Sequence, residues 1–199
     1  LDSLPPKENL ASVVSDIPWE DILYSEDFED GEVNGWKTKY KWVGLNTWIV
    51  QQDVYSNNYW SGTGTRDYPQ TWYRETNWTD YAFEVRTRNN SSEDNTAVFV
   101  CARASNDGSE FHTARLGTNS YEIAVFDGKE YRTLQKVDNI LFKRHQWYLV
   151  RLEVQGNQIR LFADNELLLS VINNTLTKGS IGFYMGGANW FEFDDLRVW

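Results

Sequence analysis

The amino-acid sequence predicts an all-β protein, a two-sheet antiparallel jelly-roll β-sandwich. Apolar and polar residues alternate with a period of two along many short segments; in 147–155, for example, Tyr148, Val150 and Leu152 share one face while Arg151 takes the other. Dipeptides of Gly, Asn and Asp separate the segments, and these residues tolerate the positive φ of tight hairpin turns. No segment shows a sustained helical period. Strands with one apolar face each pack as two stacked sheets.

The expected strands follow one another from residue 23 to the C-terminus. The first, 23–28, ends at an acidic turn. Segment 97–102 is apolar on both faces, which is typical of a central strand that is covered on both sides. Asp127-Gly128 is a strong hairpin signal. The other expected strands are 35–43, 47–55, 71–75, 80–88, 96–104, 111–116, 121–126, 130–137, 147–155, 158–163, 166–172, 180–185 and 191–199.

The chain divides into two regions of different character. Residues 1–22 are expected to be an N-terminal extension or linker, because Pro5, Pro6 and Pro18 interrupt any long periodicity. Residues 23–199 form the jelly-roll domain. Since the chain starts at a Leu rather than a Met, we interpret it as a mature form or an excised segment. We expect it to be a monomeric module of a larger secreted or surface protein.

Composition narrows the range of partners. The formal net charge of −10 argues against nucleic acid, because phosphate binding requires clustered Lys and Arg. No apolar run is long enough for membrane insertion. Aromatic residues make up 16% of the chain, with 10 Trp, 11 Tyr and 10 Phe. A domain of this size seldom needs ten Trp for packing alone, so some rings are expected to serve as flat platforms for a ligand.

The sequence gives little support for catalysis. Its two histidines, His112 and His145, lie near no telling Ser or Cys, and no nucleophile elbow is present. Cys101 is the only cysteine; it is expected to be a small core residue and excludes an intrachain disulfide. Glu192 and Asp194 share one face of a strand and are the nearest approach to a glycosidase carboxylate pair. We therefore expect a protein that is not an enzyme.

Several segments in order resemble the concanavalin A-like lectin/glucanase jelly-roll superfamily. The likeness is greatest to laminin-G-like and carbohydrate-binding-module members and to bacterial 3-keto-disaccharide hydrolase-type domains. Glucanases of this superfamily carry a Glu-x-Asp-x-x-Glu strand, whose second Glu is missing here. The resemblance covers nearly everything after residue 23 and implies a concanavalin A-like sandwich. The matching segments are 26–31, 47–50, 77–85, 97–103, 147–154, 178–183 and 193–198.

Carbohydrate binding is the first functional hypothesis. Sugars present C–H faces to aromatic rings and hydroxyl groups to charged or amide side chains, so a site needs both kinds of residue. The irregular stretch 56–70 and the residues after it supply such a mixture: Trp60, Arg66, Tyr68 and Trp72. The resemblance adds residues that would line a concave sheet: Arg103, Arg115 and Tyr121. For the Trp residues packing is the alternative interpretation, and for Arg103 it is an ion pair at a sheet edge.

A structural calcium ion (Ca2+) is the second hypothesis, and it rests on the resemblance. In several related modules, acids after the first strand and in the last strand meet at one end of the sandwich. Here this implies Asp27 and Glu29 together with Asp194 and Asp195. Calcium prefers carboxylate and carbonyl oxygens. The alternative is that these acids form turns and caps beside Arg or Lys.

We therefore expect a non-catalytic, extracellular carbohydrate-binding module that recognises an oligo- or polysaccharide. Two alternatives remain open. The first is a protein- or peptide-binding adhesion or sensor domain of laminin-G-like type, which would suit the acidic surface. The second is a glycoside hydrolase-like enzyme.

Overall fold

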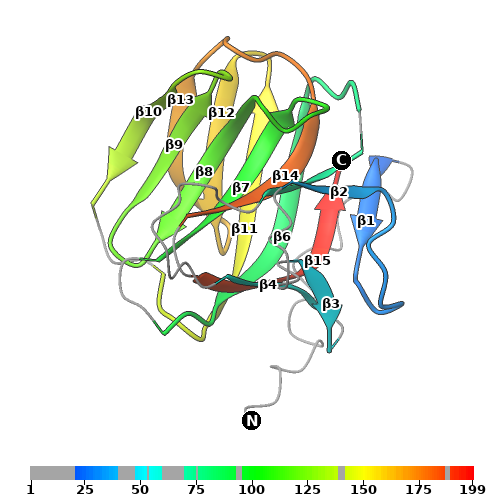
Figure 1. The fold of residues 1–199 in the computed structure, drawn as a ribbon. Helices are drawn as coiled ribbons and strands as arrows, with labels where there is room; N and C mark the ends of the chain where they lie inside the picture. The colour runs from blue at the N-terminus through cyan, green and yellow to red at the C-terminus, as the bar shows by residue number, and fades with distance from the viewer. Residues whose placement is uncertain are drawn as a thin grey trace.

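The alternating segments form two stacked antiparallel sheets in the computed structural model (Figure 1). The structure describes residues 21–39, 48–52, 54–59, 70–74, 76–92, 96–138, 142–186 and 189–199. The all-β sandwich expected from the sequence is confirmed. Within these residues no helix is long and apolar enough to cross a membrane. Most of the expected extension, residues 1–20, lies outside the described part.

We call the two layers sheet A and sheet B. Sheet A has, in spatial order, β13 (Glu166–Ile172), β12 (Gln158–Ala163), β11 (Trp147–Gln155), β6 (Tyr81–Asn89), β15 (Asn189–Val198), β4 (Val54–Tyr59) and β3 (Ile49–Gln51), with β1 (Tyr24–Glu26) also paired to β15. Sheet B has β10 (Tyr131–Val137), β9 (Tyr121–Phe126), β8 (Phe111–Gly117), β7 (Ala97–Ala104), β14 (Ser180–Gly186), β5 (Gln70–Tyr73) and β2 (Trp36–Lys39). Neighbours such as β6 and β15, far apart in sequence, make these sheets jelly-roll rather than simple meanders.

The core lies between the sheets and is filled by the inward residues of every second position. Val85 of β6 pairs with Val150 of β11, and both are buried. Phe183 of sheet B stacks on Phe193 of sheet A with ring centroids 3.9 Å apart. Each fully buried Phe stabilises the fold by roughly 1.5–3 kcal/mol through removal of apolar surface from water. These rings therefore couple the two layers.

One expected strand was wrong. Residues 47–55 were expected to run as a single strand, but β3 ends at Gln51 and β4 begins at Val54. The two pair as a hairpin, with Ile49 opposite Ser56. Gln52 has a φ of 53° and turns the chain. The turn lacks the Gly, Asn or Asp-Gly signal that usually marks such a reversal, so the apolar run looked continuous.

Candidate functional site

The outer face of sheet B is hollow because short side chains lie at its centre. Val98 and Val100 of β7 belong to the core, so Phe99 and Cys101 between and beyond them face outward. Cross-strand pairing places Cys101 beside Gly182 of β14. A Cβ built at Gly182 would lie 2.7 Å from a backbone oxygen of the neighbouring strand, so no side chain fits there.

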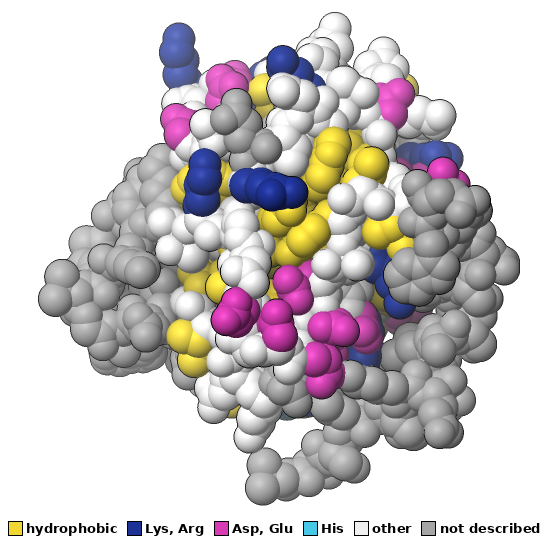
Figure 2. Space-filling view, turned by 90° about the vertical axis from the view of Figure 1, so that its right-hand side faces the viewer, with side chains coloured by type: hydrophobic (Ala, Val, Ile, Leu, Met, Phe, Trp, Pro, Cys, Tyr) yellow, Lys and Arg dark blue, Asp and Glu magenta, His cyan; other side chains and the backbone are white. Residues whose placement is uncertain are grey.

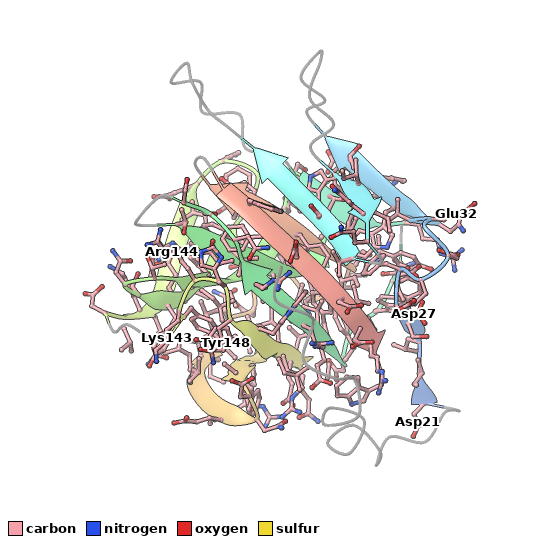
Figure 3. The ribbon with its side chains drawn as sticks, turned by 90° about the horizontal axis from the view of Figure 1, so that it is seen from below. Asp21, Asp27, Glu32, Lys143, Arg144 and Tyr148 are labelled. Atoms are coloured by element: carbon pink, nitrogen blue, oxygen red, sulfur yellow. The ribbon has the colours of Figure 1, made fainter. Side chains whose placement is uncertain are left out.

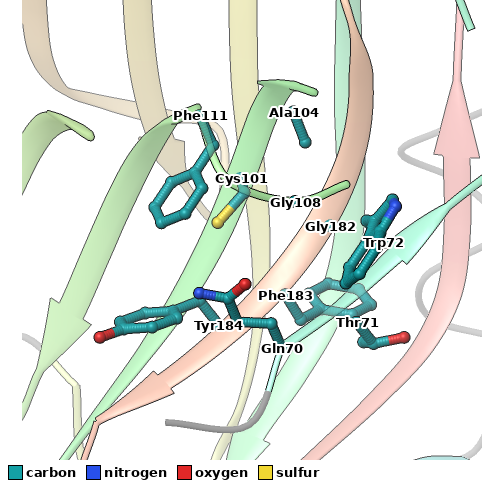
Figure 4. A pocket seen from close by; sticks show the side chains of 10 residues that line it. All are labelled: Gln70, Thr71, Trp72, Cys101, Ala104, Gly108, Phe111, Gly182, Phe183 and Tyr184. Carbon is teal, nitrogen blue, oxygen red and sulfur yellow. The ribbon is translucent and has the colours of Figure 1, made fainter. Parts of the chain in front are cut away.

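A pocket opens over this hollow between two aromatic walls (Figure 4). Trp72 of β5 forms one wall, Phe111 of β8 and Tyr184 of β14 form the other, and Cys101 and Gly182 lie between them. The free volume is about 10 Å³, which is room for one water-sized group. The pocket therefore accepts a small apolar projection rather than a whole ring.

The Trp72 ring is fixed by the turn between β7 and β8. Its Nε1 donates a hydrogen bond to the backbone oxygen of Asn106 at 2.9 Å. Lys37 Nζ donates to the side-chain oxygen of Asn106 at 2.7 Å and secures the same turn. Gly108 has a φ of 67°, and a Cβ built on it would lie 2.9 Å from the Trp72 ring. The turn thus packs against the indole as closely as a glycine allows.

The opposite wall is a group of rings that brace one another. Phe111 contacts Tyr184 with ring centroids 5.7 Å apart and contacts Phe126 at 5.6 Å. Phe99 meets Tyr184 edge to face at 4.9 Å. Such pairs add roughly 0.5–1.5 kcal/mol each beyond their buried area, so the wall is rigid.

Polar groups surround the aromatic pocket on the same face. Gln70 lines the pocket and supplies an amide (Figure 4). Farther along the face, Glu122 is 7% exposed and lies opposite Arg115 in the strand register. Tyr131 donates to one carboxylate oxygen of Glu122 at 2.8 Å, and Thr133 donates to the other at 3.2 Å. Partial burial and the Glu122 charge raise the pKa of Tyr131, so its phenol keeps its proton.

Of the seven residues expected to bind a ligand, the structure describes four, and these four do not form one group. Trp72 and Arg115 lie on the outer face of sheet B, with Trp72 in the pocket wall. Tyr121 points the other way and belongs to the core, so we exclude it from the site. Trp60, Arg66 and Tyr68 lie outside the described residues.

Arg103 is a buried structural residue rather than a ligand contact. Its side chain is almost fully buried, and its guanidinium donates to three backbone oxygens. Nη2 donates to Thr79 and to Gly156 at 2.8 Å each, and Nη1 donates to Leu176 at 3.0 Å. These oxygens belong to three separate connections, which Arg103 ties together at one end of the sandwich.

The acids considered for calcium do not form one ligand group. Asp194 and Asp195 both face the buried Arg86 guanidinium, with N–O distances of 3.6 and 3.0 Å. Asp27 and Asp195 line one hollow of about 230 Å³, while Glu29 is exposed at the turn after β1. No group of three or more His, Cys, Asp or Glu among the described residues is arranged to hold a metal ion. The geometry favours the ion-pair interpretation, in which Arg86 supplies the positive charge.

Acidic side chains near β1 lie at one side of the molecule. Asp27 and Glu32 lie on the side opposite Lys143 and Arg144 (Figure 3). On the side that carries β1, Asp and Glu side chains gather below a band of hydrophobic side chains, with Lys and Arg above it (Figure 2). On this side of the molecule, acidic and basic side chains are thus partly separated from each other.

The carboxylates on the outer face of sheet A are paired with arginines. Arg88 Nε donates to Glu192 at 2.7 Å, and both Arg86 and Arg88 lie over the Trp147 ring, 4.9 and 4.7 Å from it. Glu84 lies 3.6 Å from Arg151, and its burial raises its pKa. Glu192 and Asp194 do share this face, as the alternation predicted, but each carboxylate already faces a cation.

The buried His112 and Cys101 have no nucleophile–base geometry. His112 Nε2 bonds to the Asn173 side chain at 2.8 Å, and burial lowers its pKa to about 4. Burial raises the pKa of Cys101 to about 12, and its nearest polar partner is the Thr113 hydroxyl at 3.5 Å. Cys101 is therefore a protonated thiol in the pocket floor.

Sequence reasoning missed most of the pocket. Phe111 and Tyr184 were treated as ordinary strand residues, and Glu122 was not considered. A usable signal existed: these residues occupy the polar phase of their strands, where an aromatic ring or a lone carboxylate faces outward. Their convergence required the strand order of sheet B.

Comparison with known proteins agrees with this architecture. A family model described as a 3-keto-alpha-glucoside-1,2-lyase-like domain matches residues 24–199. A search of curated proteins gave no match.

Solved structures with the same fold include a carbohydrate-binding module, CBM66, from Bacillus subtilis, with a TM-score of 0.69 and 12% identity over 82% of this chain and 94% of that one. A Bacillus subtilis protein of unknown function with a galectin-like fold has a TM-score of 0.70 and 11% identity over 89% and 94%. A Bacillus licheniformis beta-glucanase has a TM-score of 0.65 and 12% identity over 88% and 96%. At these identities the likeness establishes the fold, and the expected jelly-roll sandwich is confirmed.

Proposed function

Because the chain belongs to the family of 3-keto-alpha-glucoside-1,2-lyase-like domains, we propose that it binds carbohydrate on the outer face of sheet B. The single observation that carries this proposal is the pocket with aromatic walls, Trp72 on one side and Phe111 and Tyr184 on the other. Aromatic faces contact the C–H surface of a sugar, and the nearby amide and charged groups can bond its hydroxyls. The binding and glucanase domains of similar fold support the same ligand class.

The polar part of the site suits a neutral ligand. Arg115 and Glu122 are opposite charges on adjacent strands, and Gln70 offers both a donor and an acceptor. A polyol can donate to the carboxylate and accept from the guanidinium at once. A free anion would have to lie near Glu122, which costs energy.

Glycan-array screening followed by calorimetry tests the proposal. We expect saturable binding to at least one glycan and a loss of affinity of roughly tenfold or more in Trp72→Ala, because buried aromatic anchors dominate small interfaces. Trp190→Ala is the matched control, since Trp190 is 40% exposed on sheet A, away from the pocket. No binding across plant, microbial and host glycans would overturn the proposal and favour a protein partner.

We further propose that the domain is non-catalytic and works outside the cytoplasm as a module of a larger protein. The pairing of Glu192 and Asp194 with arginines supports the first part.

An enzyme acting at this same face is the second candidate. The family description and the buried Glu122 carboxylate favour it. Incubation with a 3-keto-glucoside and with the unmodified disaccharide, analysed by mass spectrometry, distinguishes the two. Product formation that disappears in Glu122→Gln would replace the non-catalytic proposal, and unchanged substrates would support it.

A further inference from the structure

The pocket between the two aromatic walls is too small for a sugar ring, and most of its lining is apolar. Its walls are Trp72, Phe111 and Tyr184, and Cys101 and Ala104 lie at its base. The Cys101 thiol is directed to Thr113, and the Trp72 Nε1 to Asn106, so neither is a partner for a buried hydroxyl. A hydroxyl placed between the rings would exchange water mostly for carbon and sulfur, because the Gln70 amide is the polar group of the lining that is left to bond it.

The pocket also cannot close on itself. Trp72 is fixed by the turn that carries Asn106 and Gly108. The Phe111 and Tyr184 rings contact each other with centroids 5.7 Å apart, and no side chain fits at Gly182 to fill the floor, because a Cβ there would lie 2.7 Å from the Thr71 backbone oxygen. An empty apolar cavity with rigid walls forfeits dispersion contacts that a fitting group restores.

From this geometry we infer that the pocket receives a methyl group, and that the carbohydrate bound on sheet B carries one. The free volume of about 10 Å³ matches one such group in size. This inference rests on the proposed function. A methyl group can come from a 6-deoxyhexose or from an N-acetyl substituent, and the pocket chemistry is the same for both.

Sugar pairs that differ only in this group provide the test. L-fucose is compared with L-galactose, L-rhamnose with L-mannose, and N-acetylglucosamine with N-formylglucosamine, each as the terminal unit of the same glycan and measured by calorimetry. We expect the methyl-bearing member of at least one pair to bind about four- to tenfold more tightly. Its methyl group is buried in the pocket, whereas the hydroxyl group of a methyl-free hexose stays in water. The first two pairs and the third distinguish the two sources of the methyl group.

Substitutions of Cys101 at the pocket floor test whether a preference for the methyl-bearing sugar arises in this pocket. Cys101→Leu fills the space and is expected to bring the ratio within each pair close to one. Cys101→Ala keeps the space open and is expected to preserve the preference. Thermal unfolding of both variants shows that the fold is retained, and affinity for the methyl-free member of each pair reports the rest of the site.

The outcomes separate the two proposals. Equal binding of both members of every pair would overturn the methyl pocket while leaving carbohydrate binding intact. A preference that persists in Cys101→Leu would place the methyl group elsewhere and would also overturn it. Failure of every sugar to bind would overturn both proposals.

Discussion

Arg103 offers the sharpest test of the structure, because the sequence suggested a ligand contact and the fold makes it a clamp. Its guanidinium donates to the oxygens of Thr79, Gly156 and Leu176 from a side chain that is 1% exposed. Replacement by Met keeps much of the apolar stem but leaves three acceptors without their donor. At about 1 kcal/mol for each acceptor, the expected loss of unfolding free energy is about 3 kcal/mol.

Thermal and urea unfolding measure this loss directly. For a domain of this size, 3 kcal/mol corresponds to a fall in Tm of roughly 6–12 °C. Arg132→Met is the matched control, because Arg132 is exposed and water screens its ion pair with Asp127 at 3.4 Å, so that its loss should change the stability little. A loss below about 1 kcal/mol for Arg103→Met, or abolished glycan binding at unchanged stability, would refute the clamp.

Three further predictions concern the pocket turn, pH and metal. Gly108→Ala is expected to destabilise the protein by roughly 1–3 kcal/mol more than Gly156→Ala and to change Trp72 fluorescence. Both glycines have positive φ, but a Cβ at Gly108 would meet the Trp72 indole, whereas a Cβ at Gly156 would meet nothing within 4 Å. Equal losses would show that the turn does not hold the ring. Burial lowers the pKa of His112 from 6.5 to about 4 in the folded protein, so the unfolded chain binds this proton first as the pH drops. Stability should therefore fall between about pH 6.5 and pH 4. His112→Gln should flatten this part of the Tm–pH curve, and an unchanged slope would show that His112 is not the group responsible. A structural calcium ion at Asp27, Glu29, Asp194 and Asp195 predicts a lower Tm in EDTA. Identical melting curves with EDTA and with excess calcium would contradict the metal and support the pairing of Asp194 and Asp195 with Arg86.

Much of the fold could be predicted because alternation is a local property. Residues 147–155 form β11 with the expected inward face, and Asp127-Gly128 forms a turn between β9 and β10. The reversal at Gln52 escaped prediction because the positive φ there belongs to a residue with no strong turn preference.

The candidate site was predicted only in part. Trp72 and Arg115, which were chosen as ligand residues on different grounds, both lie on the outer face of sheet B, whereas Tyr121 faces the core. Tyr121 and Glu122 are consecutive residues of β9, and a period of two sends them to opposite faces. The choice between those faces is fixed by which one meets sheet A.

The sequence by itself determined that this chain forms strands, where most of them turn, and which residues along each strand share a face, because these properties depend on neighbours one to four positions away. Only the tertiary structure decided that Trp72, Cys101, Phe111 and Tyr184 surround one small pocket. These residues come from four strands whose order in sheet B is set by packing across the whole domain. The same long-range order placed the Arg103 guanidinium against three backbone oxygens and paired Asp194 with Arg86. The partner of a buried charged side chain depends on which segments pack around it.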